Sequence, residues 1–269
     1  MDNLKGPARP GSITWDPAGI RAIEELHVRA TLKQHVRGRL PIAAQASFER
    51  VGYVLRLAIP SAGEQLLSMM VGLVNTFLVG HLGAASLAAV GLSTQWLMMA
   101  MVLFGAVGTG STALIARLAG AREWLDANRV IRQSLIVAAA TGLIATVSLQ
   151  LWAEPALRLM GAQDEALGLG VTYLRLVSAV FVLAAFMFIG NACLRGAGDT
   201  RTPMFVMLAV NLLNVALSWV LVNGLLGLPR LGVAGAAVGE MTGRCVGGIL
   251  VVYLLWKGRS GLRLQLRHL

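Results

Sequence analysis

The sequence predicts an all-α integral membrane protein folded as a six-transmembrane-helix bundle. Of its 269 residues, 56% are hydrophobic and only 13% are charged, whereas soluble domains carry roughly 25% charged residues. The charges are gathered in short segments between long apolar stretches, so the net charge of +10 does not indicate a nucleic-acid-binding surface. Six stretches are long and apolar enough to cross a bilayer as helices. They are Leu55–Val79, Leu87–Ala116, Ser134–Trp152, Val171–Leu194, Met204–Leu228 and Leu231–Trp256.

Each predicted span is helical because a backbone inside lipid must satisfy its own polar groups. The second span is uncharged over its whole length, which is typical of a helix that is tilted or extends into the interface. An acidic loop that holds Glu154, Asp164 and Glu165 separates the third span from the fourth. The sequence RGAGDTRTP, from Arg195, predicts a tight turn before the fifth span, with positive φ at its glycines.

The distribution of basic residues predicts the orientation. Nineteen of the 23 Lys and Arg residues lie before or at the start of the first span, between the second and third, between the fourth and fifth, or after the sixth. Cytoplasmic loops of membrane proteins carry the positive excess. We therefore expect a multi-pass protein of the cell (inner) membrane with both termini in the cytoplasm.

The chain divides into three parts by composition. Residues 1–50 are expected to form a cytoplasmic tail, residues 51–257 the membrane bundle, and residues 258–269 a basic cytoplasmic tail. Within the first tail, Pro17–Leu40 mixes apolar and basic positions. It fits either an amphipathic helix lying on anionic lipid or a poorly ordered tail.

Enzyme chemistry has no recognisable motif in this sequence. There is no metal-ligand spacing, no phosphate-binding glycine loop and no arrangement of a nucleophile with a base, so we expect no catalytic residue, no metal and no cofactor. The two cysteines, Cys193 and Cys245, lie in or beside apolar helices and are expected to be free thiols.

Polar residues inside the apolar spans are the informative ones, because they are costly in lipid and usually face a bundle interior or a cavity. Glu64 follows Pro60 by four residues and is expected to bind a proton or a basic substrate; alternatively it is a helix-end carboxylate near the cytoplasmic interface. Glu240 and Arg244 have the i, i+4 spacing at which an acid and a base meet. They form either a structural pair or a pair in which Glu240 exchanges its partner during transport.

Two further patterns involve packing and hydrogen bonding. Glycines recur every four residues in the sixth span, a pattern that allows close contact between membrane helices. They are Gly235, Gly239, Gly243 and Gly247. Amide and hydroxyl side chains in the first, fourth and fifth spans suggest a polar path. They are Asn75, Asn191, Asn211, Asn214 and Ser218.

Four stretches carry a resemblance to a known family. They read IPSAGEQLLSMMVGLVNTFLVGHLG from Ile59, LRGAGDTRTPM from Leu194, NLLNVALSWVLVNG from Asn211 and GLPRLGVAGAAVGEMTGR from Gly227. With these stretches, the chain resembles the N-terminal half of multidrug and toxic compound extrusion (MATE) transporters over roughly residues 50 to 257. The resemblance implies one lobe of such a transporter, and secondary active transport rather than catalysis: export of small organic, often cationic, compounds in exchange for H⁺ or Na⁺.

The resemblance also shows where this chain departs from the family. Many members carry an Asp in the first helix where this chain has Asn75, and an Asp in the fifth helix where it has Ser218, four residues after Asn214. Glu240 stands near a family threonine position and restores one negative charge. Without a cationic neighbour on its own helix turn, Glu64 is expected to be the proton carrier, and Glu240 the contact for a cationic substrate.

The length leaves several functions open, because the family normally has twelve helices. The chain is expected to be half of a twelve-helix unit, pairing with a second six-helix half or with a second copy about an axis along the membrane normal. The alternatives are a truncated, non-transporting fragment or assembly subunit, or a lipid-linked sugar flippase. The flippase would be favoured by a large basic cavity, and Arg244 is the only basic residue that we expect to be buried.

Overall fold

The computed structural model describes residues 42–225, 227 and 229–258. The chain divides into two units, Met1–Leu55 and Arg56–Leu269, and the expectations for the two tails fall largely outside the described residues. Seven helices are described. They are α2 (Ile42–Gly80), α3 (Ala84–Gly120), α4 (Trp124–Leu159), α5 (Asp164–Ser178), α6 (Phe181–Gly196), α7 (Arg201–Asn223) and α8 (Val233–Lys257).

The helices of the second unit confirm the predicted fold class. Five helical segments are long and apolar enough to cross a membrane, and α5 with α6 makes a sixth, bent span. Large apolar side chains point outward along these segments, among them Leu73, Val102 and Leu151, each about 70% exposed. A bundle with an apolar exterior is what a bilayer stabilises. The protein is therefore a multi-pass, all-α membrane protein.

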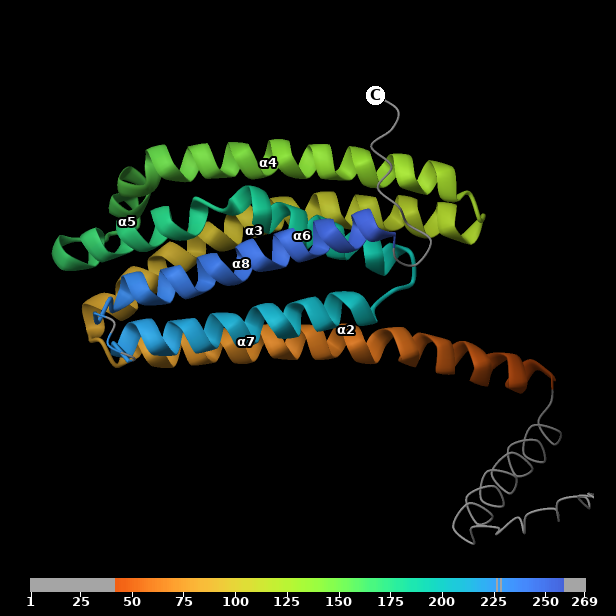
Figure 1. The fold of residues 1–269 in the computed structure, drawn as a ribbon, viewed down its shortest axis with the longest axis horizontal. Helices are drawn as coiled ribbons and strands as arrows, with labels where there is room; N and C mark the ends of the chain where they lie inside the picture. Colours follow the sequence, from red (N-terminus) through yellow and green to blue (C-terminus); the bar gives the residue numbers. More distant parts are fainter. Residues whose placement is uncertain (1–41, 226, 228, 259–269) are drawn as a thin grey trace, which may run out of the picture. The chain divides into compact units, whose positions relative to one another are not determined.

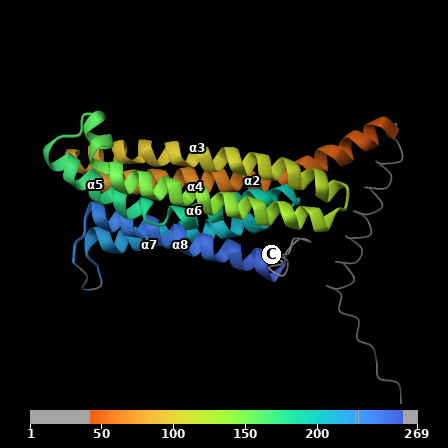
Figure 2. The same cartoon turned by 90° about the horizontal axis from the view of Figure 1, so that it is seen from above.

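Helix α6 lies at the centre of the bundle. It packs on α3 and α4 on one side and on α8 on the other, and α8 in turn packs on α7. Figures 1 and 2 both show α6 between α4 and α7. Most of its residues are buried. Polar groups on α6 are therefore presented to neighbouring helices rather than to lipid.

The predicted fourth span, Val171–Leu194, is not one continuous helix in the structure. The segment breaks after Ser178, and α5 and α6 meet at an angle of 55°. Polar side chains of α4 bond two carbonyl groups beside the break: Gln150 donates to the Arg175 carbonyl at 2.7 Å, which also accepts from the Ala179 amide, and Thr146 donates to the Ser178 carbonyl at 3.1 Å. A break inside a membrane is tolerated where neighbouring side chains supply such partners.

The glycines of α8 lie where this helix packs on α7. A Cβ at Gly235 would lie 2.8 Å from the carbonyl carbon of Leu221, and one at Gly239 would overlap the hydroxyl of Ser218. Further along the helix, a Cβ at Gly243 would lie 3.2 Å from the Val210 carbonyl oxygen, and one at Gly247 would overlap the side chains of Met187 and Val210. The stripe thus brings the backbones of α7 and α8 together.

The turn between α6 and α7 is built differently from the expectation. Gly198 adopts a positive φ of 86°, as expected, but Gly196 belongs to the helix. A Cβ at Gly196 would lie 2.8 Å from the Thr112 carbonyl oxygen, so its role is close packing of α6 on α3. Asp199 then caps α7, because its carboxylate accepts from the Thr202 amide at 3.0 Å and the Thr202 hydroxyl at 2.6 Å.

Helix α2 is attached to the bundle differently from the others. Among the described residues, α2 packs closely along its length on no other helix. Of the α2 residues whose burial is described, only Leu78 and Val79 are fully buried. Elsewhere half-buried apolar side chains, among them Leu67 and Val71, lie along one face of α2, and two polar contacts link the helix to the bundle: an ion pair of Glu64 and a hydrogen bond of Asn75.

The packing of α8 on α7 yields a first prediction. Gly239→Leu forces a side chain against Ser218 and should destabilise the bundle by about 1–3 kcal/mol or more, as overpacking does in other interiors. The matched control is Gly110→Leu on α3, because a Cβ added at Gly110 would meet no described atom within 4 Å. The unfolding temperature of the detergent-solubilised protein should fall for Gly239→Leu and stay unchanged for Gly110→Leu. Equal unfolding temperatures would show that the stripe is not a packing surface.

Candidate functional site

The polar side chains predicted to line a path form three groups in the structure. The first is the Glu64–Arg195 pair, which joins α2 to α6. The second is an asparagine cluster of Asn75, Asn214 and Ser218, which joins α2 to α7. The third is the Glu240–Arg244 pair on α8. The first two groups are eleven residues apart on α2, about 16 Å along a helix axis.

The Glu64–Arg195 pair corrects one premise of the sequence analysis. Glu64 has a cationic partner, which comes from α6 rather than from its own helix. One guanidinium nitrogen of Arg195 bridges both carboxylate oxygens of Glu64, at 2.9 and 3.1 Å. Arg195 is therefore the last-turn residue of a membrane helix whose side chain turns back into the bundle, and not simply a residue of a cytoplasmic turn.

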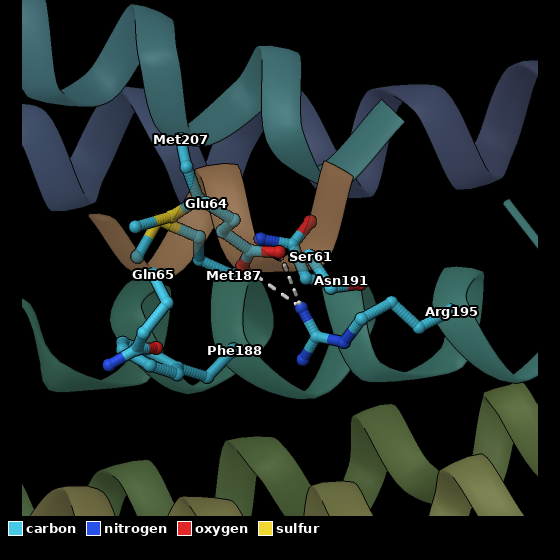
Figure 3. Close-up of a pocket in the computed structure, with 8 residues that line it drawn as sticks. All are labelled: Ser61, Glu64, Gln65, Met187, Phe188, Asn191, Arg195 and Met207. Carbon is cyan, nitrogen blue, oxygen red and sulfur yellow. Dashed lines mark hydrogen bonds and ion pairs between the residues drawn. The ribbon is translucent and has the colours of Figure 1, made fainter. Parts of the chain in front are cut away.

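A pocket of about 270 Å³ surrounds this ion pair. Figure 3 shows Glu64 and Arg195 facing each other across it, with the Phe188 ring and two methionine side chains around them. Asn191, one turn before Arg195 on α6, forms part of the wall and is 2% exposed. The pocket therefore combines charge, amide groups and an apolar surface.

The asparagine cluster contains no charge. The Asn214 Oδ1 accepts from Asn75 Nδ2 at 3.4 Å and from the Ser218 hydroxyl at 3.3 Å. The Asn75 Oδ1 is buried and has no hydrogen-bond partner. The positions where many family members carry acids are thus neutral here, and they lie together in the structure.

The Glu240 carboxylate is held by donors from two helices. Arg244 bonds it from the next turn of α8, and the hydroxyl of Tyr173 donates to it from α5. Both charged side chains are about 15% exposed, and the guanidinium of Arg244 also lies over the Phe181 ring, 5.5 Å from its centre. An enclosed pair with these partners cross-links α5, α6 and α8.

The third group lies at the depth of the asparagine cluster. Gly239 contacts Ser218, and the next residue, Glu240, is turned by about 100° around α8, toward Tyr173 on α5. Two partners, Arg195 and Tyr173, were missed by the sequence analysis. A lone Tyr or a terminal Arg has no distinctive local pattern, and each partner lies more than 60 residues from the carboxylate that it bonds.

Together, the fold and its interior groups define a multi-pass helical membrane protein with charged and amide side chains buried between its helices. Among the described residues, no group of three or more acidic, His or Cys side chains is placed to hold a metal ion. The MatE family model matches residues 60–220. The chain belongs to this family, the multidrug and toxic compound extrusion transporters.

Relatives and solved structures agree with this assignment. The chain is 32% identical to the probable multidrug resistance protein NorM of Thermotoga maritima, over 76% of this chain and 44% of that protein. It is 28% identical to the FAD transporter of Shewanella oneidensis, over 75% of this chain and 45% of that protein. A MOP superfamily transporter from Pyrococcus furiosus superposes with a TM-score of 0.75 at 31% identity, over 80% of this chain and 47% of that one. The chain thus spans about half the length of these relatives and matches one lobe.

The Tyr173–Glu240 contact yields a second prediction. Tyr173→Phe removes a donor to a buried carboxylate and should destabilise the bundle by about 1.5–3 kcal/mol, the usual value for a hydrogen bond to a charged group. Tyr253→Phe is the control, because Tyr253 is on α8 and 48% exposed. The readout is thermal unfolding in detergent. A Tyr173→Phe variant as stable as the control would show that the Tyr173–Glu240 hydrogen bond does not stabilise the bundle.

Proposed function

We propose that this chain is one half of a membrane efflux transporter that exports small organic compounds, chiefly cations, in exchange for H⁺ or Na⁺. Membership of the MatE family over residues 60–220 carries the proposal. The buried polar groups support it, because such groups in membrane spans usually line a transport path or a proton relay. The transporter is a secondary active one, without a catalytic residue.

We propose a second six-helix half as the partner of this chain in the membrane. The relatives are about twice as long as the matched region, and their remaining length accounts for a second lobe. The partner is either a separate chain or a second copy of this one. Two copies with the same orientation would pair about an axis along the membrane normal, like the parallel repeats of other transporters.

The orientation and the membrane are part of the same proposal. The positive excess at one end of the bundle favours cytoplasmic termini in the inner membrane. In this orientation the Glu64–Arg195 pair lies toward the cytoplasm, because α6 ends and α7 begins there. The asparagine cluster and Glu240 lie deeper in the bundle.

The coupling step follows from the two internal carboxylates. Both are neutralised by arginine, so a proton or a substrate cation takes either site only by displacing a guanidinium. We assign the proton exchange to Glu64, whose pocket is open, and the deeper contact with the cation to Glu240. Asn75, Asn214, Ser218 and Arg244 complete the path as uncharged ligands or as the exchanging partner.

The topology gives a third prediction. In a variant without native cysteines, a cysteine at Thr200 should react with a membrane-impermeant maleimide only after cells are opened. A cysteine at Gln163, in the loop before α5, should react in intact cells. Labelling of position 200 from outside intact cells would show that the orientation is the opposite of the one proposed.

Transport itself gives a fourth prediction. Efflux of a fluorescent cation from vesicles under an imposed pH gradient should be abolished by Glu64→Gln, since this variant cannot exchange a proton, while Glu240→Gln should mainly weaken recognition of the cation. Glu154→Gln, which removes an exposed pair with Arg158, is the matched control. Efflux by Glu64→Gln at the rate of the unmodified protein would refute the assignment of Glu64.

The same assay tests the half-transporter proposal. The unmodified chain should export as a self-associated dimer or when reconstituted with a second six-helix half. If neither preparation exports the dye, the chain is better described as a non-transporting membrane subunit.

A further inference from the structure

The Glu64 pocket shares two wall residues with a second cavity. The first pocket lies between α2, α6 and α7, and the second, of about 440 Å³, lies between α3 and α6. Phe188 and Arg195, two turns apart on one face of α6, line both. Arg195 thus has space on the α3 side, beside Thr109 and Thr112, into which its side chain can move when it leaves Glu64.

The contact between Arg195 and Glu64 is one that an ammonium group reproduces. Arginine commonly binds a carboxylate with two nitrogens in a fork, which gives it an advantage over amines. Here a single nitrogen bridges both oxygens of Glu64. An ammonium nitrogen in the same position makes the same two hydrogen bonds, so replacing the guanidinium by a substrate amine loses no contact on Glu64.

A second acceptor stands beside this position. The Asn191 Oδ1 is buried without a hydrogen-bond partner, although buried amide oxygens are normally bonded. Asn191 belongs to the wall of the Glu64 pocket, and Figure 3 shows its side chain beside Glu64. If the amide turned by half a turn about its last torsion, Oδ1 would take the place of Nδ2 and would accept a hydrogen bond from a donor held by Glu64.

The rest of the wall is apolar and polarisable. The Phe188 ring and the thioethers of Met187 and Met207 surround the two acceptors. Thioethers adapt to varied apolar shapes, and an aromatic ring attracts a cation over its face. The lining therefore fits a molecule with one charged donor group and an apolar body.

We infer that the Glu64 pocket is the site where the substrate first binds from the cytoplasmic side, and that it selects protonated amines bearing N–H groups. The ammonium displaces Arg195, donates to Glu64 and to Asn191, and places its apolar body against Phe188, Met187 and Met207. That the substrate binds from the cytoplasmic side rests on the proposed function. The assignment of the binding site rests on the geometry of the Glu64 pocket alone. Because the Glu64–Arg195 pair is one of the main links of α2 to the bundle, binding also loosens α2.

The first test uses two probes on the unmodified chain in phosphatidylcholine nanodiscs. One probe is a dansyl-labelled pentanediamine with a free primary ammonium, and the other is its trimethylammonium analogue, which has the same charge and no N–H donor. Fluorescence titration should show the primary ammonium binding about tenfold or more tightly, the value of a charge-assisted hydrogen bond. Equal affinities for the two probes would overturn the inference.

The second test uses variants of the site. Glu64→Gln and Asn191→Leu should each weaken binding of the primary ammonium. Arg195→Met should instead tighten it, because this variant removes the group with which the amine competes. Arg158→Met, from the exposed pair with Glu154, is the control and should change nothing. If Arg195→Met weakens binding as Glu64→Gln does, the ion pair is structural and the pocket does not take amines by exchange.

These measurements separate the inference from the proposed function. Binding is measured without a gradient and without a second half. If the chain binds the amine as described but does not export it, the inferred binding site is supported and only the proposed transport is refuted. A chain that exports cations while binding both probes equally refutes the site. A variant that does not fold is recognised by its thermal unfolding, and the probe pair on the unmodified chain then decides.

Discussion

Close backbone contact is the constraint on which this bundle depends. Helices in lipid gain little from excluding water from each other, so their association requires van der Waals contact and internal hydrogen bonds. Gly235 and Gly239 bring α8 against α7, Gly196 brings α6 against a carbonyl of α3, and Gly142 brings α4 against the start of α6. These contacts enclose α6 and place its polar groups between helices, where each must find a partner or a ligand.

Helix α2 is the exception, and its position explains the chemistry of the site. It lacks the close packing of the other helices among the described residues, and polar contacts at Glu64 and Asn75 link it to α6 and α7. Such contacts are exchangeable, whereas packed glycine surfaces are not. A helix linked in this way can respond to a proton or to a substrate cation, because either one competes directly with the group that attaches it.

Features encoded locally could be predicted from the sequence. Long apolar stretches indicated the six spans, and the four-residue repeat from Gly235 to Gly247 indicated a packing stripe. The break after Ser178 could not be predicted, because no Gly or Pro marks it and the groups that stabilise it, Thr146 and Gln150, belong to another helix.

The pairing of polar groups shows the same limit. The i, i+4 spacing predicted that Glu240 would meet Arg244. The partner of Glu64 is 131 residues away in the sequence, and no periodic pattern connects the two. The sequence therefore indicated that Glu64 is important but not what surrounds it. A buried charge must have a partner, yet nothing in the local sequence indicates where in the chain that partner lies.

The Glu64–Arg195 pair is the charged link that holds α2 against the bundle. Electron spin resonance distances in nanodiscs, between labels at Leu66 on α2 and Leu114 on α3, two exposed positions, report whether the pair has this role. The unmodified protein should give one narrow distance distribution, and Arg195→Met should give a broader or displaced one. Identical distributions in the two proteins would show that α2 is held by something other than this ion pair.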